Sequence, residues 1–291
     1  MNIGPLATKE FQFRMRGPRA FSLLTIYLGV LSGVALIMYL GASLAFEDIG
    51  GNRALGQPLY WLIIGMQVIL VCFVAPAFTV GAISAERERG TFDLLRTTLL
   101  EPVEIAGGKF LAALGYVLII VGCSLPLFGL AFTLGGVEPF QMVLSVWCVC
   151  VTAVSASALG LCISAHVRST VNSAVVTYAV ILSVLIGLPI MVLIVAGLLL
   201  PALPGSSAST AATGNEFLSE ILVYVASLSP IGVFTGNEAN YLTSGRVWSM
   251  TIPGSSQIFP APFLVFSFGH LLASALLFWF TVRRLGRADK L

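Results

Sequence analysis

Four consecutive charged residues, Glu86 to Arg89, lie between two long apolar segments and form the densest charged run of the chain. Alternating acidic and basic side chains can pair, and Glu86 and Arg89 stand at i, i+3 on one helix face. Gly90 is suited to end that helix, and Thr91 is suited to cap a new one. The chemistry that this group predicts is ion pairing and docking.

Catalytic and metal-binding patterns are missing from the sequence. It contains no HExxH, no GxSxG and no Ser/His/Asp set, and Gly107-Gly108-Lys109 lacks the upstream glycine of a phosphate loop. The five cysteines have no metal-site spacing, since Cys148 and Cys150 are two apart and would point to different sides of a helix. We therefore expect no catalytic residue, no metal, no cofactor and no enzymatic activity in this chain.

The elements that position the charged run are expected to be membrane-spanning helices. The chain of 291 residues is 57% hydrophobic and 10% charged, whereas soluble domains carry about 25% charged residues. Continuous apolar runs must cross lipid as helices, because helices satisfy their own backbone groups. We predict an all-α polytopic protein, one transmembrane domain over residues 1–291, with six spans at about 21–46, 58–84, 105–134, 141–165, 171–200 and 261–282.

The basic residues predict the orientation of these spans. Of the 15 basic residues, all but Arg53 and Arg246 fall on one side of the predicted membrane. Since positive loops face the cytoplasm, both termini are expected there, in the plasma membrane. The inside residues are Lys9, Arg14, Arg16, Arg19, Arg87, Arg89, Arg96, Lys109, Arg168, Arg283, Arg284, Arg287 and Lys290.

A loop at about 201–260 is expected on the outer side. It contains an apolar stretch at about 216–234, in which Glu216 and Glu220 stand at i, i+4 and Pro230 interrupts. Treating this stretch as a seventh span would move the basic tail outside. We therefore predict an interfacial or re-entrant helix on the outer face before the last span.

The predicted spans contain almost no ionisable group at membrane depth. This argues against an ion-coupled carrier or a voltage sensor, which need such groups. His270 lies near the middle of a span, either as a substrate or proton contact or as a neutral imidazole bonded to a neighbouring helix. Pro76, Pro126 and Pro189 also lie within spans and can kink them.

A short helix is predicted after Thr91. Phe92, Leu95 and Leu99 fall on one face at i, i+3, i+7, and Pro102 then suits the first position of the returning helix. A short helix with an apolar face presented to the cytoplasm is what docking of a soluble partner requires.

The stretch AERERGTFDLLRTTLLEPVEIAGGKFLAAL resembles the hallmark region of permease subunits of type-2 ABC transporters. The region departs from many relatives at Leu99 to Pro102, where they have Pro-Leu-Ser-Pro. The basic N-terminal segment, the six spans, the long outer loop and the short basic tail extend the resemblance to the whole chain. The matching positions are Glu86, Gly90, Thr91, Leu94, Leu95, Pro102, Glu104, Ile105 and Lys109.

The resemblance implies a coupling helix at about 91–98 that seats in an ABC ATP-binding subunit. It also implies two permease chains, identical or different, with two ATPase chains that hold the ATP and Mg, and export as the usual direction. Lipid is the other expected partner, and a net charge of +2 is too small to suggest nucleic acid. The implied ATPase contacts are Glu86, Arg87, Glu88, Arg89, Gly90, Thr91, Phe92, Leu94, Leu95 and Arg96.

The N-terminal segment fits the interfacial helix of the same family. Its basic residues could contact anionic headgroups, and Phe11 and Met15 are spaced i, i+4. The residues expected at this membrane interface are Lys9, Arg14, Arg16 and Arg19.

Two other functions remain open at this point. One is a membrane assembly protein whose cytoplasmic loop docks a soluble partner other than an ATPase. The other is a membrane-embedded enzyme or electron-transfer subunit, which two histidines and the missing catalytic patterns make the weaker alternative.

Overall fold

The computed structural model describes residues 8, 10–12, 18–45, 56–91, 101–135, 137–202, 221–244, 248–251 and 258–288. Within these residues the contacts divide the chain into two compact units. The first comprises Met1–Tyr178 and Ala273–Leu291, and the second comprises Ala179–Leu272.

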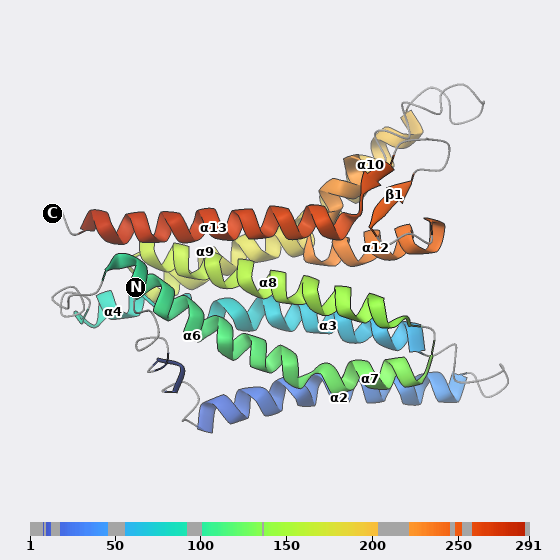
Figure 1. Ribbon diagram of the computed structural model, residues 1–291, viewed down its shortest axis with the longest axis horizontal. Coiled ribbons are helices and arrows are strands. Elements are labelled where there is room, and N and C mark those ends of the chain that lie inside the picture. The colour runs from blue at the N-terminus through green and yellow to red at the C-terminus, as the bar shows by residue number, and fades with distance from the viewer. Residues whose placement is uncertain are drawn as a thin grey trace. The chain divides into compact units, whose positions relative to one another are not determined.

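Six helical segments among the described residues are long and apolar enough to cross a membrane. The prediction of an all-α polytopic protein with six spans is therefore confirmed, and Figure 1 shows these helices. The segments are Phe21–Gly41, Gly56–Ala77, Pro102–Thr133, Pro139–His166, Thr170–Leu198 and Pro262–Gly286.

Helix α3 (Gly56–Ala77) is the core of the first unit. It packs against α2 (Pro18–Ala45), α6 (Pro102–Cys123), α7 (Leu125–Thr133) and α8 (Pro139–His166). Its inward stripe repeats at i, i+3 and i+4, as expected for a helix with one buried face. The buried residues are Gly56, Leu59, Tyr60, Ile63, Ile64, Gln67, Val68, Val71, Cys72, Ala75 and Pro76.

The seam between α3 and α8 is closed by polar contacts at one end and by a glycine at the other. The Tyr60 hydroxyl donates to the carbonyl of Gln141 at 3.0 Å and lies 2.6 Å from Ser145 Oγ. Toward the other end, a Cβ at Gly160 would collide with Thr79. That Cβ would also lie 3.4 Å from Pro76 of α3, so the missing side chain lets the two helices run side by side, as Figure 1 shows.

Each of the three prolines noted within predicted spans lies at an interruption of a helix. Pro76 is followed by the end of α3 at Ala77, earlier than the predicted 84. Pro126 follows the break at Ser124 between α6 and α7. Pro189 follows a π-helical turn, η2 (Ser183–Gly187), that precedes α10 (Leu188–Ala202). Such breaks are the expected effect of a residue without an N–H.

The second unit contains η2, α10, α12 (Pro230–Ser244) and a short antiparallel hairpin of β1 (Ser249–Thr251) and β2 (Ile258–Pro260). Helices α9 (Thr170–Leu182) and α13 (Pro262–Ala288) run through both units. Residues 221–227 are helical, whereas 203–220 lie outside the described residues. The interfacial or re-entrant helix therefore stays a prediction.

His270 lies in the second unit and bonds within it. Its Nε2 donates to the carbonyl of Leu228 at 2.9 Å, and its ring packs on Phe266 with centroids 4.2 Å apart. These contacts match the interpretation of a neutral imidazole bonded to a neighbouring helix.

Candidate functional site

The candidate site is the segment Phe78–Thr91, which we call the joint. After Pro76 the chain forms turns, in which the amides of Thr79 and Val80 donate to the Pro76 carbonyl at 2.9 and 2.8 Å. One helical turn follows as α4 (Ser84–Glu88). The sequence suggested that the second span continues as one helix into the charged run. The structure instead ends that helix at Ala77 and begins a new one at Ser84.

Serines from other helices hold the joint in this conformation. Ser164 Oγ on α8 accepts from the backbone amides of Ile83 and Ser84, both at 3.0 Å. Ser173 Oγ on α9 donates to the carbonyl of Val80 at 3.0 Å. These hydroxyls replace intrahelical partners, because a buried backbone group left unpaired costs free energy. The break is thus built by residues about 80 and 90 positions away in sequence.

Gly90 ends α4, as predicted. Its φ is +68°, a conformation that glycine adopts without strain and that often terminates helices. The Thr91 amide then donates back to the carbonyl of Glu86 at 3.0 Å. The Thr91 hydroxyl donates to the same carbonyl at 3.3 Å.

Glu86 pairs with Lys109 on α6. The Lys109 Nζ lies 2.6 Å from Glu86 Oε1 and 3.0 Å from Glu10 Oε1, and the Lys109 side chain is 5% exposed. A buried ammonium needs such partners, because desolvation of an unpaired charge is costly. Through this one lysine, α6 is therefore bound to both the joint and the N-terminal segment. The predicted contact of Glu86 with Arg89 is replaced by this pair.

Arg87 binds the end of α8. Its Nη1 donates to the carbonyl of Ala165 at 2.9 Å, in the last turn of that helix. A cation there satisfies a free carbonyl and interacts favourably with the helix dipole. Burial and the nearby Arg284 and Arg168 lower the pKa of Arg87, but a guanidinium remains charged at neutral pH.

Glu88 binds the beginning of α9. Its carboxylate accepts from the Thr170 amide at 2.8 Å and from the Thr170 hydroxyl at 2.7 Å. An anion at a helix N-terminus satisfies a free amide and favours the helix dipole. These two bonds with Thr170 hold the pKa of Glu88 below its ordinary range.

The three residues therefore bind three different helices. Glu86 binds α6, Arg87 the end of α8, and Glu88 the start of α9. An apolar cluster also fills the space between the joint, α6, α8 and α13. The cluster consists of Ile83, Ala106, Leu161, Ala165 and Leu285.

The other predicted site residues are either exposed or outside the described residues. Arg89, Gly90 and Thr91 are exposed at the end of the joint. Phe92, Leu94, Leu95 and Arg96 lie outside the described residues, as do Lys9, Arg14 and Arg16. Arg19 is in α2, but its side chain is outside the description.

The returning helix α6 begins as predicted. Pro102 stands in its first turn, and the Glu101 amide donates to Glu104 Oε2 at 3.3 Å within a capping box. Sequence reasoning gave no separate role to Lys109, although a charge just inside an apolar span demands a partner. It gave none to Ser164, Ser173 or Thr170, because hydroxyl residues are too common in helices to indicate distant contacts.

Comparison with known proteins gives one family. The model of a family described as ABC-2 family transporter protein matches residues 5–289. No curated protein matches the chain.

Proposed function

The chain belongs to the ABC-2 family of transporter proteins and is a membrane-spanning permease subunit of an ABC transporter. On this basis we propose how an ATPase subunit is coupled to its membrane-spanning helices. A separate ATPase subunit docks on the segment at about 91–98 and moves the spans through the joint. The segment follows Thr91 directly, so the joint is its covalent connection to the second span.

The observation that carries this proposal is the binding of consecutive charged residues to three different helices. A displacement of the docking segment would reach α6 through Glu86, α8 through Arg87 and α9 through Glu88. Charge-assisted hydrogen bonds are short and roughly twice as strong as neutral ones, so the connection is stiff. Coupling of this kind needs contiguous contacts between elements that move together.

Basic residues support a cytoplasmic position for the joint. Arg168 and Arg284 lie close enough to Arg87 to lower its pKa, so three cations from separate elements gather there. Positively charged ends of membrane helices face the cytoplasm. The rest of the proposal comes from the family resemblance: a plasma-membrane exporter of two permease and two ATPase chains, with ATP and Mg in the ATPase.

We further propose that the N-terminal segment lies at the cytoplasmic membrane surface. Glu10 bonds to Lys109, and Phe11 packs so closely on α6 that a Cβ at Gly115 would lie 3.3 Å from its ring. These contacts tie the segment to the first half of the span Pro102–Thr133, and its neighbouring basic residues would meet headgroups at the membrane surface. The stretch at about 216–234 would lie at the opposite surface.

Affinity purification of the tagged chain in mild detergent tests the docking proposal. Wild type should bring down a soluble ATPase, identified by mass and by ATP hydrolysis. A Phe92→Asp, Leu95→Asp double variant should lose it, because two charges replace the apolar face of the predicted helix.

Thr97→Asp is the matched control, because helical spacing places residue 97 on the opposite face. This variant should retain the ATPase, and all three chains should elute alike in size-exclusion chromatography. Recovery of no ATPase, or of one that is indifferent to the double variant, would instead favour a docking protein with another partner.

A further inference from the structure

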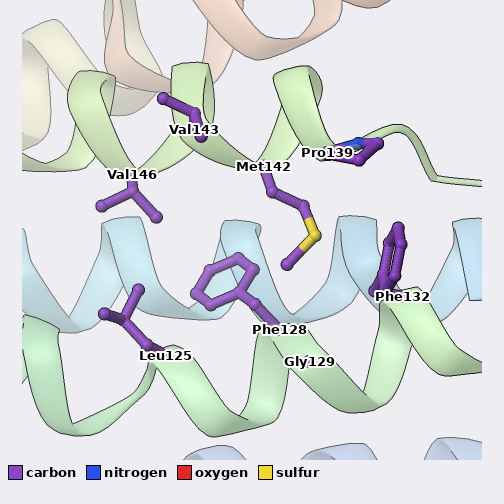
Figure 2. A pocket seen from close by; sticks show the side chains of 8 residues that line it. All are labelled: Leu125, Phe128, Gly129, Phe132, Pro139, Met142, Val143 and Val146. Atoms are coloured by element: carbon purple, nitrogen blue, oxygen red, sulfur yellow. The ribbon is translucent and has the colours of Figure 1, made fainter.

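A groove lined only by apolar residues lies between α7 and the first turns of α8. Its volume is about 450 Å³. Figure 2 shows Phe128 from α7 and Met142 from α8 pointing toward each other across it. Gly129 lines it as well, and a Cβ there would meet no atom within 4 Å. The groove therefore has room beside the glycine.

The break at Ser124 explains why the groove exists. Before the break, α6 packs on both α8 and α3, whereas after it α7 packs mainly on α3. The Ser124 amide and hydroxyl both bond back to the carbonyl of Val121, at 3.1 and 2.7 Å, and Pro126 follows in the new helix. Helices α7 and α8 are thus both held on α3 and leave a space between their facing sides.

The groove is continuous with the surface that faces lipid. Phe128 at its base is fully buried, whereas Leu125, Phe132 and Val143 at its rim are 46%, 45% and 66% exposed. Both flanking helices belong to membrane-crossing segments, so hydrocarbon surrounds the rim. Empty cavities lined by apolar side chains stay dry and take apolar molecules.

We propose that this groove binds one acyl chain of a membrane lipid, from the leaflet at the end of α6–α7 opposite the joint. Within the part of the chain that the structure describes, no polar side chain lines it, so it selects for hydrocarbon and not for a headgroup. Its volume is in the range of small-molecule sites. Gly129 is the one glycine among its eight lining residues, and the rim carries Leu, Phe and Val, whereas associating membrane helices use small or hydrogen-bonding residues. A lipid chain therefore fits it better than a second copy.

Photolabelling tests the proposal in the full-length chain. The chain is placed in phosphatidylglycerol nanodiscs that contain a phosphatidylglycerol with a diazirine on one acyl chain. Peptides covering residues 125–146 should carry more label than the exposed face of α9. Gly129→Leu should lower the label on these peptides about tenfold, because its side chain displaces several methylenes, each of which contributes to affinity.

Gly122→Leu is the matched control. This glycine precedes the break, is exposed, and has open space at its Cβ, so the same substitution leaves the groove empty. Its label should equal that of wild type. If Gly129→Leu fails to elute as a folded chain, Met142→Trp fills the groove from the α8 side and should lower the label in the same way.

Three results would overturn the proposal. One is equal labelling of wild type and the filled variants, and another is labelling at 125–146 no denser than on α9. The third is a disulfide between two Val143→Cys copies in the membrane, which would show that a second copy covers the groove. None of these results involves the ATPase, so failure here is distinct from failure of the docking proposal.

Discussion

Lys109 is the residue with the most to explain, because it carries a charge into the end of a membrane-spanning helix. Its side chain is almost completely buried, and two carboxylates lie within 3.0 Å of its ammonium. A buried cation persists only when its partners offset the cost of desolvation. Lys109, Glu86 and Glu10 compensate one another's charges. Removing Lys109 alone should therefore destabilise the protein more than removing Lys109 together with the charge of Glu86.

The first prediction concerns this group. Lys109→Met should lower the free energy of unfolding by about 3 kcal/mol, the lower end for broken buried pairs, since both carboxylates are about a quarter exposed. The variant leaves Glu86 and Glu10 facing each other without a cation. Unfolding in mixed micelles, followed by circular dichroism, measures the change.

The double variant Glu86→Gln, Lys109→Met is the control for this prediction. It removes one of the two unpaired carboxylates together with the cation and should recover part of the lost stability. A double variant less stable than the single one would contradict a role for charge compensation.

The second prediction concerns the pH dependence of Glu88. Its folded-state pKa is lowered by the two bonds with Thr170, so its contribution is present above the ordinary glutamate pKa of about 4.3. The contribution is lost as the pH falls through the lowered folded-state value. Wild type should therefore be more stable than Glu88→Gln at pH 6, and the difference should shrink as the pH falls below the ordinary glutamate pKa of about 4.3.

Parallel unfolding curves of the two proteins across this pH range measure the difference. Comparing it as a function of pH cancels the other carboxylates, which titrate in both. A difference that stays constant down to the lowest pH would show that the Glu88 charge is not what stabilises the start of α9.

At the scale of elements, the break between α3 and α4 depends on Ser164. Its hydroxyl oxygen is the acceptor for two backbone amides of the joint. The third prediction is that Ser164→Ala lowers the free energy of unfolding by about 1–3 kcal/mol, the cost of leaving a buried donor unpaired. Thermal unfolding in detergent shows whether the variant is less stable than wild type and how it ranks against the control variant.

Ser157→Ala is the matched control on the same helix. Ser157 is fully buried, and its hydroxyl has no hydrogen-bond partner among the described residues, so its removal should be neutral or stabilising. Equal losses for the two serines would mean that the hydroxyl volume matters and the bonds to the joint do not.

The elements themselves could be predicted from the sequence, and this break could not. Apolar runs of more than about 20 residues require helices in lipid, which is why the six spans were predicted correctly. The end of α3 at Ala77 was missed because Pro76 alone does not decide whether a helix kinks or stops. The decision depends on Ser164 and Ser173, which only the folded chain brings to the joint.

The candidate site likewise has features that could be predicted from the sequence and features that could not. Gly90 could be identified locally, because ending a helix needs only its own conformational freedom. The partners of Glu86, Arg87 and Glu88 could not, because each lies on another helix. Local spacing suggested that Glu86 would pair with Arg89, but the buried Lys109 has greater need of a carboxylate.

At the scale of the whole molecule, orientation can be tested directly. In a variant without native cysteines, Thr91→Cys should react with a membrane-impermeant thiol reagent only from the cytoplasmic side. Trp248→Cys, in the predicted outer loop and 63% exposed, should react only from outside. Labelling of intact cells and of inverted vesicles compares the two sides, and the reverse pattern would contradict the assignment from basic residues.

The most direct test of the account measures whether an ATPase moves the spans through the joint. Spin labels at Leu111→Cys on α6 and Val171→Cys on α9, both exposed positions, report the distance between two helices that the joint binds. In the complex with its ATPase, trapping with ATP and vanadate should change this distance. In the same complex carrying Glu88→Ala, with retention of the ATPase checked by co-purification, the change should fall to less than about half, since the bond to α9 is gone. An unchanged shift in Glu88→Ala, or no shift in wild type with the ATPase bound, would contradict the account.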